Sequence, residues 1–133
     1  VKAVVHNHST YATAFAMNNM PIDTKALTEV NLTLGVIPVC KYGTPGTELI
    51  YADLKNVIGN LYAVLLANHG LLAFGPTLDI AFSYAEGVEK VAQTITIAGR
   101  VGAPSSIPDA ESEALRQFGS AARDAAIAKS LAE

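Results

Sequence analysis

The chain has 133 residues, which suffices for one modest domain with a single hydrophobic core. Half of the residues are apolar and 16% are charged, so we expect part of the apolar surface to be covered by another subunit or by further chain. A net charge of -3 argues against nucleic acid or a membrane surface as a partner, and no apolar run approaches the ~20 residues of a membrane span. The single cysteine, Cys40, cannot form an internal disulfide, which fits a cytoplasmic protein.

The first part of the chain predicts short elements separated by turn residues. Residues 1–7 are rich in β-branched side chains and predict a core strand. The chain opens in the middle of that strand, so we expect an N-terminal part to be missing. Ser9 fits the N-cap of a short helix over residues 10–17. Residues 23–34 are ambiguous between a short helix and a loop followed by a strand, and residues 35–42 predict an edge strand.

The second part predicts two further strands and three helices. They are, in order, a helix over residues 48–58 capped by Thr47, a turn at 59–60, strands over 63–67 and 71–74, a helix over 78–100, a linker, and a helix over 109–131. Apolar residues recur at three- and four-residue steps in the helix over 78–100, as one buried face requires; they are Phe82, Ala85, Val88, Ala92 and Ile95.

All three histidines of the chain lie at the ends of apolar strands. His6 and His8 flank Asn7, and side chains two residues apart on a strand point to the same face. His69 follows the next buried strand and precedes Gly70. If these strands are neighbours in one sheet, three imidazoles meet at one end of it. Three histidines with an open position are the ligand set of a catalytic zinc, which polarises a substrate oxygen and stabilises the charge that develops there.

Two segments around these histidines resemble the metal-site segments of the class II aldolase/adducin family. The first is Val-Val-His-Asn-His-Ser at residues 4–9, followed by Tyr-Ala-Thr-Ala at residues 11–14. The second is Leu-Leu-Ala-Asn-His-Gly-Leu at residues 65–71, followed by Gly75. The helix over 78–100 is similar to the long helix that follows in that family. The resemblance extends to about residue 105.

The resemblance implies an α/β fold with a central mixed sheet flanked by helices. Residues 1–133 would form a single domain, the C-terminal two-thirds of the family's domain. It implies Zn²⁺ bound by His6, His8 and His69, although Mn²⁺, Co²⁺ and Fe²⁺ also suit three imidazoles. It further implies a lyase that cleaves a C–C bond in a small, phosphorylated sugar or hydroxy-carbonyl compound, in a cytoplasmic homotetramer.

The sequence departs from the family aldolases at two positions. Their acid/base carboxylate lies upstream of the His-x-His strand, so the catalytic residue is expected before Val1, and Asp23 and Glu29 do not match it. Residues 24–27 lack the tyrosine that reaches a neighbouring subunit in family aldolases. Epimerase, decarboxylase or dehydratase chemistry at the same metal therefore stays open. A non-catalytic, adducin-like interaction domain is a further alternative, and the three histidines argue against it.

The helix that follows His8 offers one further candidate. Ser9 and Thr10 open this helix beside the expected metal, where free backbone N–H groups favour an anionic ligand group. As ordinary N-terminal residues of a helix, they need no such role.

Overall fold

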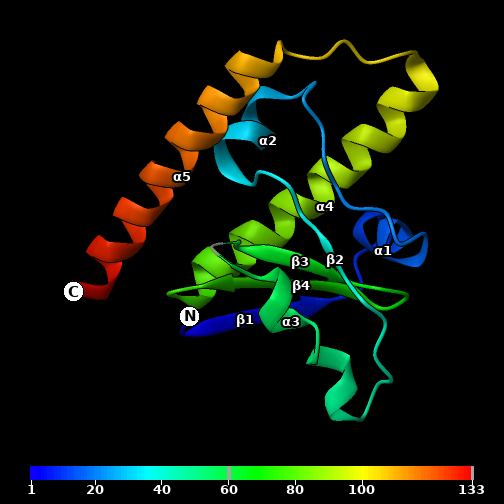
Figure 1. Cartoon of the computed structure of the whole chain (residues 1–133), viewed down its shortest axis with the longest axis vertical. Helices are drawn as coiled ribbons and strands as arrows, with labels where there is room; N and C mark the ends of the chain where they lie inside the picture. Colours follow the sequence, from blue (N-terminus) through cyan, green and yellow to red (C-terminus); the bar gives the residue numbers. More distant parts are fainter. Residues whose placement is uncertain (60, 133) are drawn as a thin grey trace.

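The centre of the molecule is a four-stranded sheet with the strand order β1-β4-β3-β2 (Figure 1). The structure, a computed structural model, describes residues 1–59 and 61–132. The strands are β1 (Ala3–Asn7), β2 (Val39–Cys40), β3 (Ala63–Leu66) and β4 (Gly70–Gly75). β4 pairs antiparallel with β1 and β3, whereas β2 pairs parallel with β3. The sheet is mixed, which confirms the predicted α/β class.

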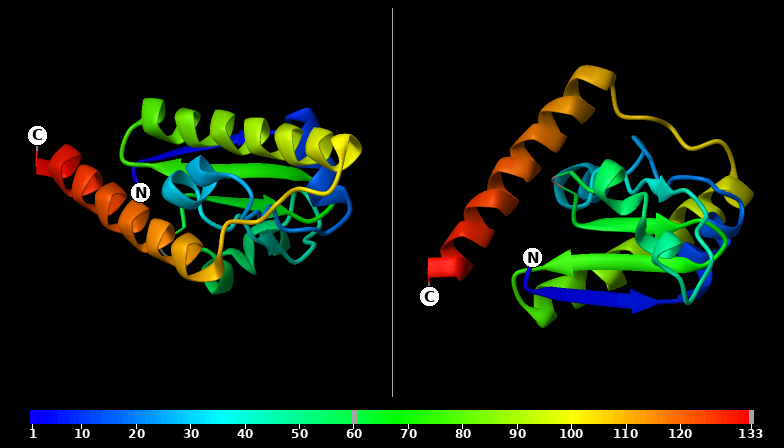
Figure 2. Two further views of the ribbon diagram at one scale, coloured as in Figure 1. Left: turned by 90° about the horizontal axis from the view of Figure 1, so that it is seen from above. Right: turned by 60° about the horizontal axis from the view of Figure 1, so that its bottom comes forward.

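Helices are distributed over both faces of this sheet (Figure 2). They are α1 (Thr10–Met17), α2 (Thr28–Thr33), the 3-10 helix η1 (Glu48–Tyr51), α3 (Leu54–Val57), α4 (Leu78–Val101) and α5 (Asp109–Ala132). In the described part of the chain, no helix combines the length and the apolar character that crossing a membrane requires.

The alternation of side chains along the buried strand β3 divides the core into two layers. Ala63 and Leu65 face the larger layer, which α1, α2 and α4 cover. Val64 and Leu66 face the smaller layer, which the residues of η1 and α3 cover. All four residues of β3 are buried, because helices shield both of its faces.

Two predicted elements are shorter than the sequence indicates. The strand predicted over residues 35–42 is reduced to β2, since Pro38 has no N–H to donate and the N–H of Lys41 donates to the carboxylate of Asp53 (2.9 Å). The helix predicted over residues 48–58 is divided into η1 and α3. Asp53, between them, uses its side chain to bond to the backbone, which competes with a continuous helix. The turn predicted at residues 59–60 includes residue 60, which lies outside the described residues.

The buried face of α4 is displaced around the helix from the one that the sequence predicts. Its buried residues are Ala81, Ala85, Val88, Val91 and Ala92. Phe82 is 52% exposed, which contradicts its predicted place in the core, and Ile95 is only partly buried. Gly75 permits a close approach of α4 to the end of β4, since a Cβ on Gly75 would lie 2.8 Å from the backbone N of Ala81. Phe82 lies about 100° around the helix from Ala81, so it is off the face that Ala81, Ala85 and Val88 turn to the core.

A polar network holds α5 against α2. Asn31 is fully buried, and its Oδ1 accepts hydrogen bonds from Ser112 (2.9 Å) and from Nε of Arg116 (2.8 Å). Arg116 also forms an ion pair with Asp23 (2.7 Å). A Cβ on Gly119 would overlap the backbone of α2, so the two helices touch directly. An unsatisfied buried polar group costs about 1–3 kcal/mol, so the network specifies one placement of α5.

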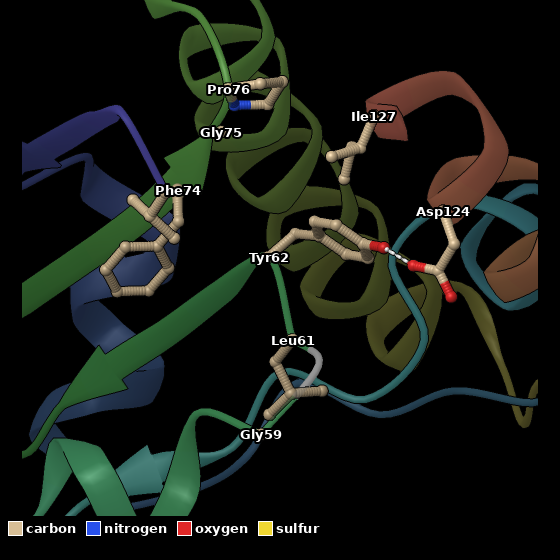
Figure 3. Close-up of a pocket in the computed structure, with 9 residues that line it drawn as sticks. Gly59, Leu61, Tyr62, Phe74, Gly75, Pro76, Asp124 and Ile127 are labelled. Carbon is tan, nitrogen blue, oxygen red and sulfur yellow. Dashed lines mark hydrogen bonds between the residues drawn. The ribbon is translucent and has the colours of Figure 1, made fainter. Parts of the chain in front are cut away.

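Farther along α5, Asp124 accepts a hydrogen bond from the hydroxyl of Tyr62 (2.6 Å; Figure 3). The ring of Tyr62 stacks on Tyr84, and the guanidinium of Arg123 lies 5.0 Å from its centre. Burial, followed by the bond to Asp124, raises the pKa of Tyr62 to about 12. A cavity of about 200 Å³ beside these residues is lined by Val1, Gly59, Leu61, Tyr62, Phe74, Gly75, Pro76, Asp124 and Ile127. This cavity lies at the opposite end of β1 and β4 from the histidines, since Gly75, which lines it, pairs with Ala3 at the start of β1.

Candidate metal centre

The three histidines converge at one end of the sheet. His6 lies in β1, His8 directly follows it, and His69 lies in the turn between β3 and β4. Because β1 pairs with β4, with Asn7 opposite Leu71, this turn lies beside the end of β1. One nitrogen from each ring lies within 4.8 Å of the others, and the ring centroids are 4.8–5.0 Å apart. The predicted convergence is therefore present.

The backbone sets the orientation of His6. Its Nδ1 donates a hydrogen bond to the carbonyl of Leu71 (2.9 Å), since a carbonyl can only accept. Nδ1 therefore carries the proton, and Nε2 keeps its lone pair. Metal-binding histidines commonly have such a partner, because it holds the ring and selects the tautomer.

His69 is the most enclosed of the three rings. Burial, and then the charges that His6 and His8 carry when protonated, lower the pKa of His69. The folded protein thus keeps this imidazole neutral at pH values where an unfolded chain begins to protonate it, and only a neutral imidazole binds a metal. Nδ1 of His69 is buried and has no hydrogen-bond partner among the described residues, which is a cost that a ligand would remove.

The turn that carries His69 depends on its two neighbours. Asn68 has a left-handed backbone (φ 57°), which asparagine tolerates better than most residues. A Cβ on Gly70 would lie 2.5 Å from the carbonyl oxygen of Asn7 and 2.6 Å from Cδ2 of His8. Glycine at this position therefore lets the turn lie directly against the end of β1 and the ring of His8.

The N-terminus of α1 differs from the prediction. Ser9 occupies the N-cap position, but its side chain makes no capping bond. Glu89 of α4 replaces it, since its two carboxylate oxygens accept hydrogen bonds from the N–H groups of Tyr11 (3.0 Å) and Ala12 (2.8 Å). The N–H of Ser9 donates to Asn7 (3.2 Å). The N–H groups of Ser9, Tyr11 and Ala12 are therefore not free for an anionic substrate, which leaves only that of Thr10 from the anion site considered at Ser9 and Thr10.

The donor set fits a first-row divalent metal. Three imidazole nitrogens from three places in the chain can hold one ion and leave a coordination position open, as in catalytic zinc sites. In the described residues, these histidines are the sole group of three or more His, Cys, Asp or Glu side chains that could share one ion. Asp23, which does not match the position of the family's catalytic carboxylate, is paired with Arg116.

Cys40 is not part of this centre. It is 1% exposed in the smaller core layer, and burial, with a lesser effect of the Asp53 charge, raises its pKa to about 11. At pH 8 roughly one thiol in a thousand is ionised, and the thiolate is the reactive form. We therefore expect very slow alkylation of native Cys40 by iodoacetamide at pH 8, and a rate that rises with pH up to about 11 while the fold persists. The labelling rate in urea is the reference, and equal rates in both states would contradict this.

Comparisons with known proteins identify the family. The model of the Class II Aldolase and Adducin N-terminal domain matches residues 1–96, which include all three histidines. The chain belongs to the class II aldolase and adducin family. This confirms the resemblance carried by the two histidine segments.

The relatives of this class II aldolase domain include two kinds of enzyme. The chain is 34% identical to 3-oxo-tetronate 4-phosphate decarboxylase of Escherichia coli K12 over 102 residues, which cover 74% of the chain and 48% of the relative. It is 35% identical to L-fuculose phosphate aldolase of E. coli O6:H1 over 91 residues, which cover 68% of the chain and 42% of that protein. The chain thus spans about half the length of the curated relatives that it matches.

A solved structure has the same fold. An L-fuculose 1-phosphate aldolase superposes with a TM-score of 0.75 and 32% identity, covering 86% of the chain and 53% of the aldolase. This agreement confirms the predicted fold class.

Proposed function

We propose that His6, His8 and His69 bind one divalent metal, and that the chain supplies the metal-binding part of a class II aldolase active site. The convergence of three ring nitrogens within 4.8 Å carries this proposal. The membership of the family supports it, because class II aldolases typically use a divalent metal. Zn²⁺ is the metal we propose, since it suits a set of three imidazoles with an open position.

The reaction we propose is the cleavage of a C–C bond in a small, phosphorylated hydroxy-carbonyl compound. A bound metal supplies a Lewis acid that polarises a substrate oxygen and stabilises negative charge on it. The protein's own residues prepare the site, because Leu71 holds His6 in one tautomer and burial keeps His69 neutral. A carboxylate that the family aldolases carry before the His-x-His strand would move the proton. A cytoplasmic homotetramer and one domain over residues 1–133 belong to the same proposal.

A decarboxylase is the second candidate. The chain is as similar to the tetronate phosphate decarboxylase as to the fuculose phosphate aldolase, at 34% and 35% identity. Both activities break a C–C bond and leave negative charge on the carbon next to a carbonyl, and a metal held by the three histidines would supply the Lewis acid that either reaction needs. The same three histidines would serve either reaction.

The test uses the protein at its natural length. It is freed of metal with a chelator, reloaded with Zn²⁺, Mn²⁺ or Co²⁺, and incubated separately with L-fuculose 1-phosphate and 3-oxo-tetronate 4-phosphate. Release of an aldehyde indicates the aldolase, and release of CO₂ indicates the decarboxylase. A protein that binds none of these metals, and is inactive with both compounds, would contradict the proposal and favour an adducin-like interaction domain.

A further inference from the structure

The helix α1 contacts both halves of the metal centre. It begins two residues after His8. At its other end, the backbone N–H of Asn68 donates to the carbonyl of Ala16 (2.9 Å). The side-chain amide of Asn68 donates to the carbonyl of Met17 (3.3 Å). One short helix is thus covalently joined to His8 and hydrogen-bonded to the residue that precedes His69.

Glu89 holds the first end of α1 from a distant part of the chain. Its partly buried carboxylate accepts the N–H groups of Tyr11 and Ala12, which lie 78 and 77 residues away. A carboxylate that accepts two N–H groups at a helix N-terminus is a strong, directional partner, because charge and hydrogen bonding act together. Glu89 belongs to α4, which packs against both β1 and β4. It therefore ties α1 to the layer that supports the strands of the metal centre.

Neither end of α1 is held by local sequence alone. Ser9 makes no capping bond, so the first turn of α1 relies on Glu89. The carbonyls of the last turn accept N–H groups from Asn18, Asn19 and Met20, which follow directly in the chain. Asn68 adds bonds from outside this segment, to the carbonyls of Ala16 and Met17. Glu89 lies on α4, which packs on the sheet, and Asn68 lies in the turn between β3 and β4, next to His69. This arrangement couples the position of α1 to the separation between the histidine segments.

We propose that α1 is a spacer that sets the separation between the His6–His8 pair and His69, with Glu89 and Asn68 as the positioning residues at its two ends. This role rests on the metal centre proposed above. It requires no contact between Glu89 and the metal, because Glu89 acts through α1. A site bound by three side chains is tight only when its ligands are held within about 0.5 Å of the productive geometry. Release of one end of α1 lets the two histidine segments move apart.

The substitution Glu89→Gln tests the first end. Glutamine keeps one acceptor oxygen, but it loses the charge and presents an NH₂ group to the second N–H. We expect the Kd for Zn²⁺ to rise by about 10–100-fold, as when an outer partner of a metal site is removed. The Kd is measured by competition with a chromophoric chelator, and Co²⁺ absorption spectra report the ligand geometry. The matched control is Glu86→Gln, since Glu86 is exposed and lies one turn earlier on α4. This variant should keep the wild-type Kd and Co²⁺ spectrum.

The substitution Asn68→Gly tests the second end independently. Glycine accepts the left-handed backbone of this position and keeps the backbone bond to Ala16, but it loses the side-chain bond to Met17. We expect a rise in the Zn²⁺ Kd that is smaller than for Glu89→Gln. If Glu89→Gln does not fold, the Zn²⁺ Kd of Asn68→Gly alone tests the spacer role.

Three results separate the proposals. A folded Glu89→Gln or Asn68→Gly protein with a lower Tm but the wild-type Kd and Co²⁺ spectrum would overturn the spacer role, because the contacts would then be only structural. A wild-type protein that binds no Zn²⁺ would instead overturn the metal centre itself. Weakened binding in both variants, with the Glu86→Gln control unchanged, supports the spacer.

Discussion

Replacing His69 by alanine is expected to abolish the binding of one Zn²⁺ per chain. His69 is one of three ligands, and the two that remain, His6 and His8, cannot hold the ion tightly by themselves. The loss should exceed the roughly 10–100-fold that removal of an outer partner costs. Metal content after gel filtration, measured by mass spectrometry, reports the stoichiometry, and any lyase activity should fall with it.

The stability of the metal-free protein distinguishes loss of the metal from loss of the fold. Nδ1 of His69 is buried without a partner among the described residues, so the substitution breaks no hydrogen bond there. We expect an unfolding free energy in urea, without metal, that is equal to or slightly above the wild-type value. Gln117→Ala, at an exposed position of α5, serves as the control and should keep one Zn²⁺ per chain. Stoichiometric metal in His69→Ala would contradict its assignment as a ligand.

Replacing Gly70 by alanine is expected to damage both the metal centre and the fold. The new methyl group would press on the carbonyl oxygen of Asn7 and on the ring of His8, at 2.5 and 2.6 Å. The Asn7 carbonyl belongs to β1 and cannot rotate away, so the turn must move relative to the end of the strand. We expect a loss of about 1–3 kcal/mol in the free energy of unfolding, as in other overpacked sites. The Zn²⁺ affinity should also fall by about 10-fold or more, because His8 is displaced.

The matched control for this prediction is Gly102→Ala. Gly102 has an extended backbone (φ 171°), and a Cβ there would have no heavy atom within 4 Å. This variant should keep the wild-type Zn²⁺ Kd and unfold at the wild-type urea concentration. If Gly70→Ala also kept the wild-type Zn²⁺ Kd and the wild-type stability in urea, the close contact between the turn and β1 would not hold the site together.

The convergence of the three histidines was largely predictable because its strongest signals are local. Residues two apart on a strand share a face, so His6 and His8 follow from the pattern of β1 alone. His69 was recognisable because it lies between two apolar runs and next to a glycine. The resemblance to the family rested on these same segments, and the family model matches them.

Other parts of the site were not predictable from local patterns. Glu89 lies 77 residues from the helix that it caps, and its own surroundings in the sequence are those of an ordinary helical glutamate. Ser9 was the better local candidate for the cap, and it does occupy the N-cap position, but its side chain makes no capping bond. Likewise, Asp53 interrupts the helix predicted over residues 48–58 only because its carboxylate reaches the backbone of Lys41.

By itself, the sequence determined the alternation of strands and helices, the three metal-ligand candidates and the family. These follow from side-chain periodicity and from residues that are close together in the chain. The tertiary structure alone decided that β4 lies between β1 and β3, which brings the turn of His69 beside His8. It also decided that a carboxylate of α4, rather than Ser9, caps α1. Both depend on which distant segments pack together, because the position of a partner across the sheet leaves no periodic signal in the chain.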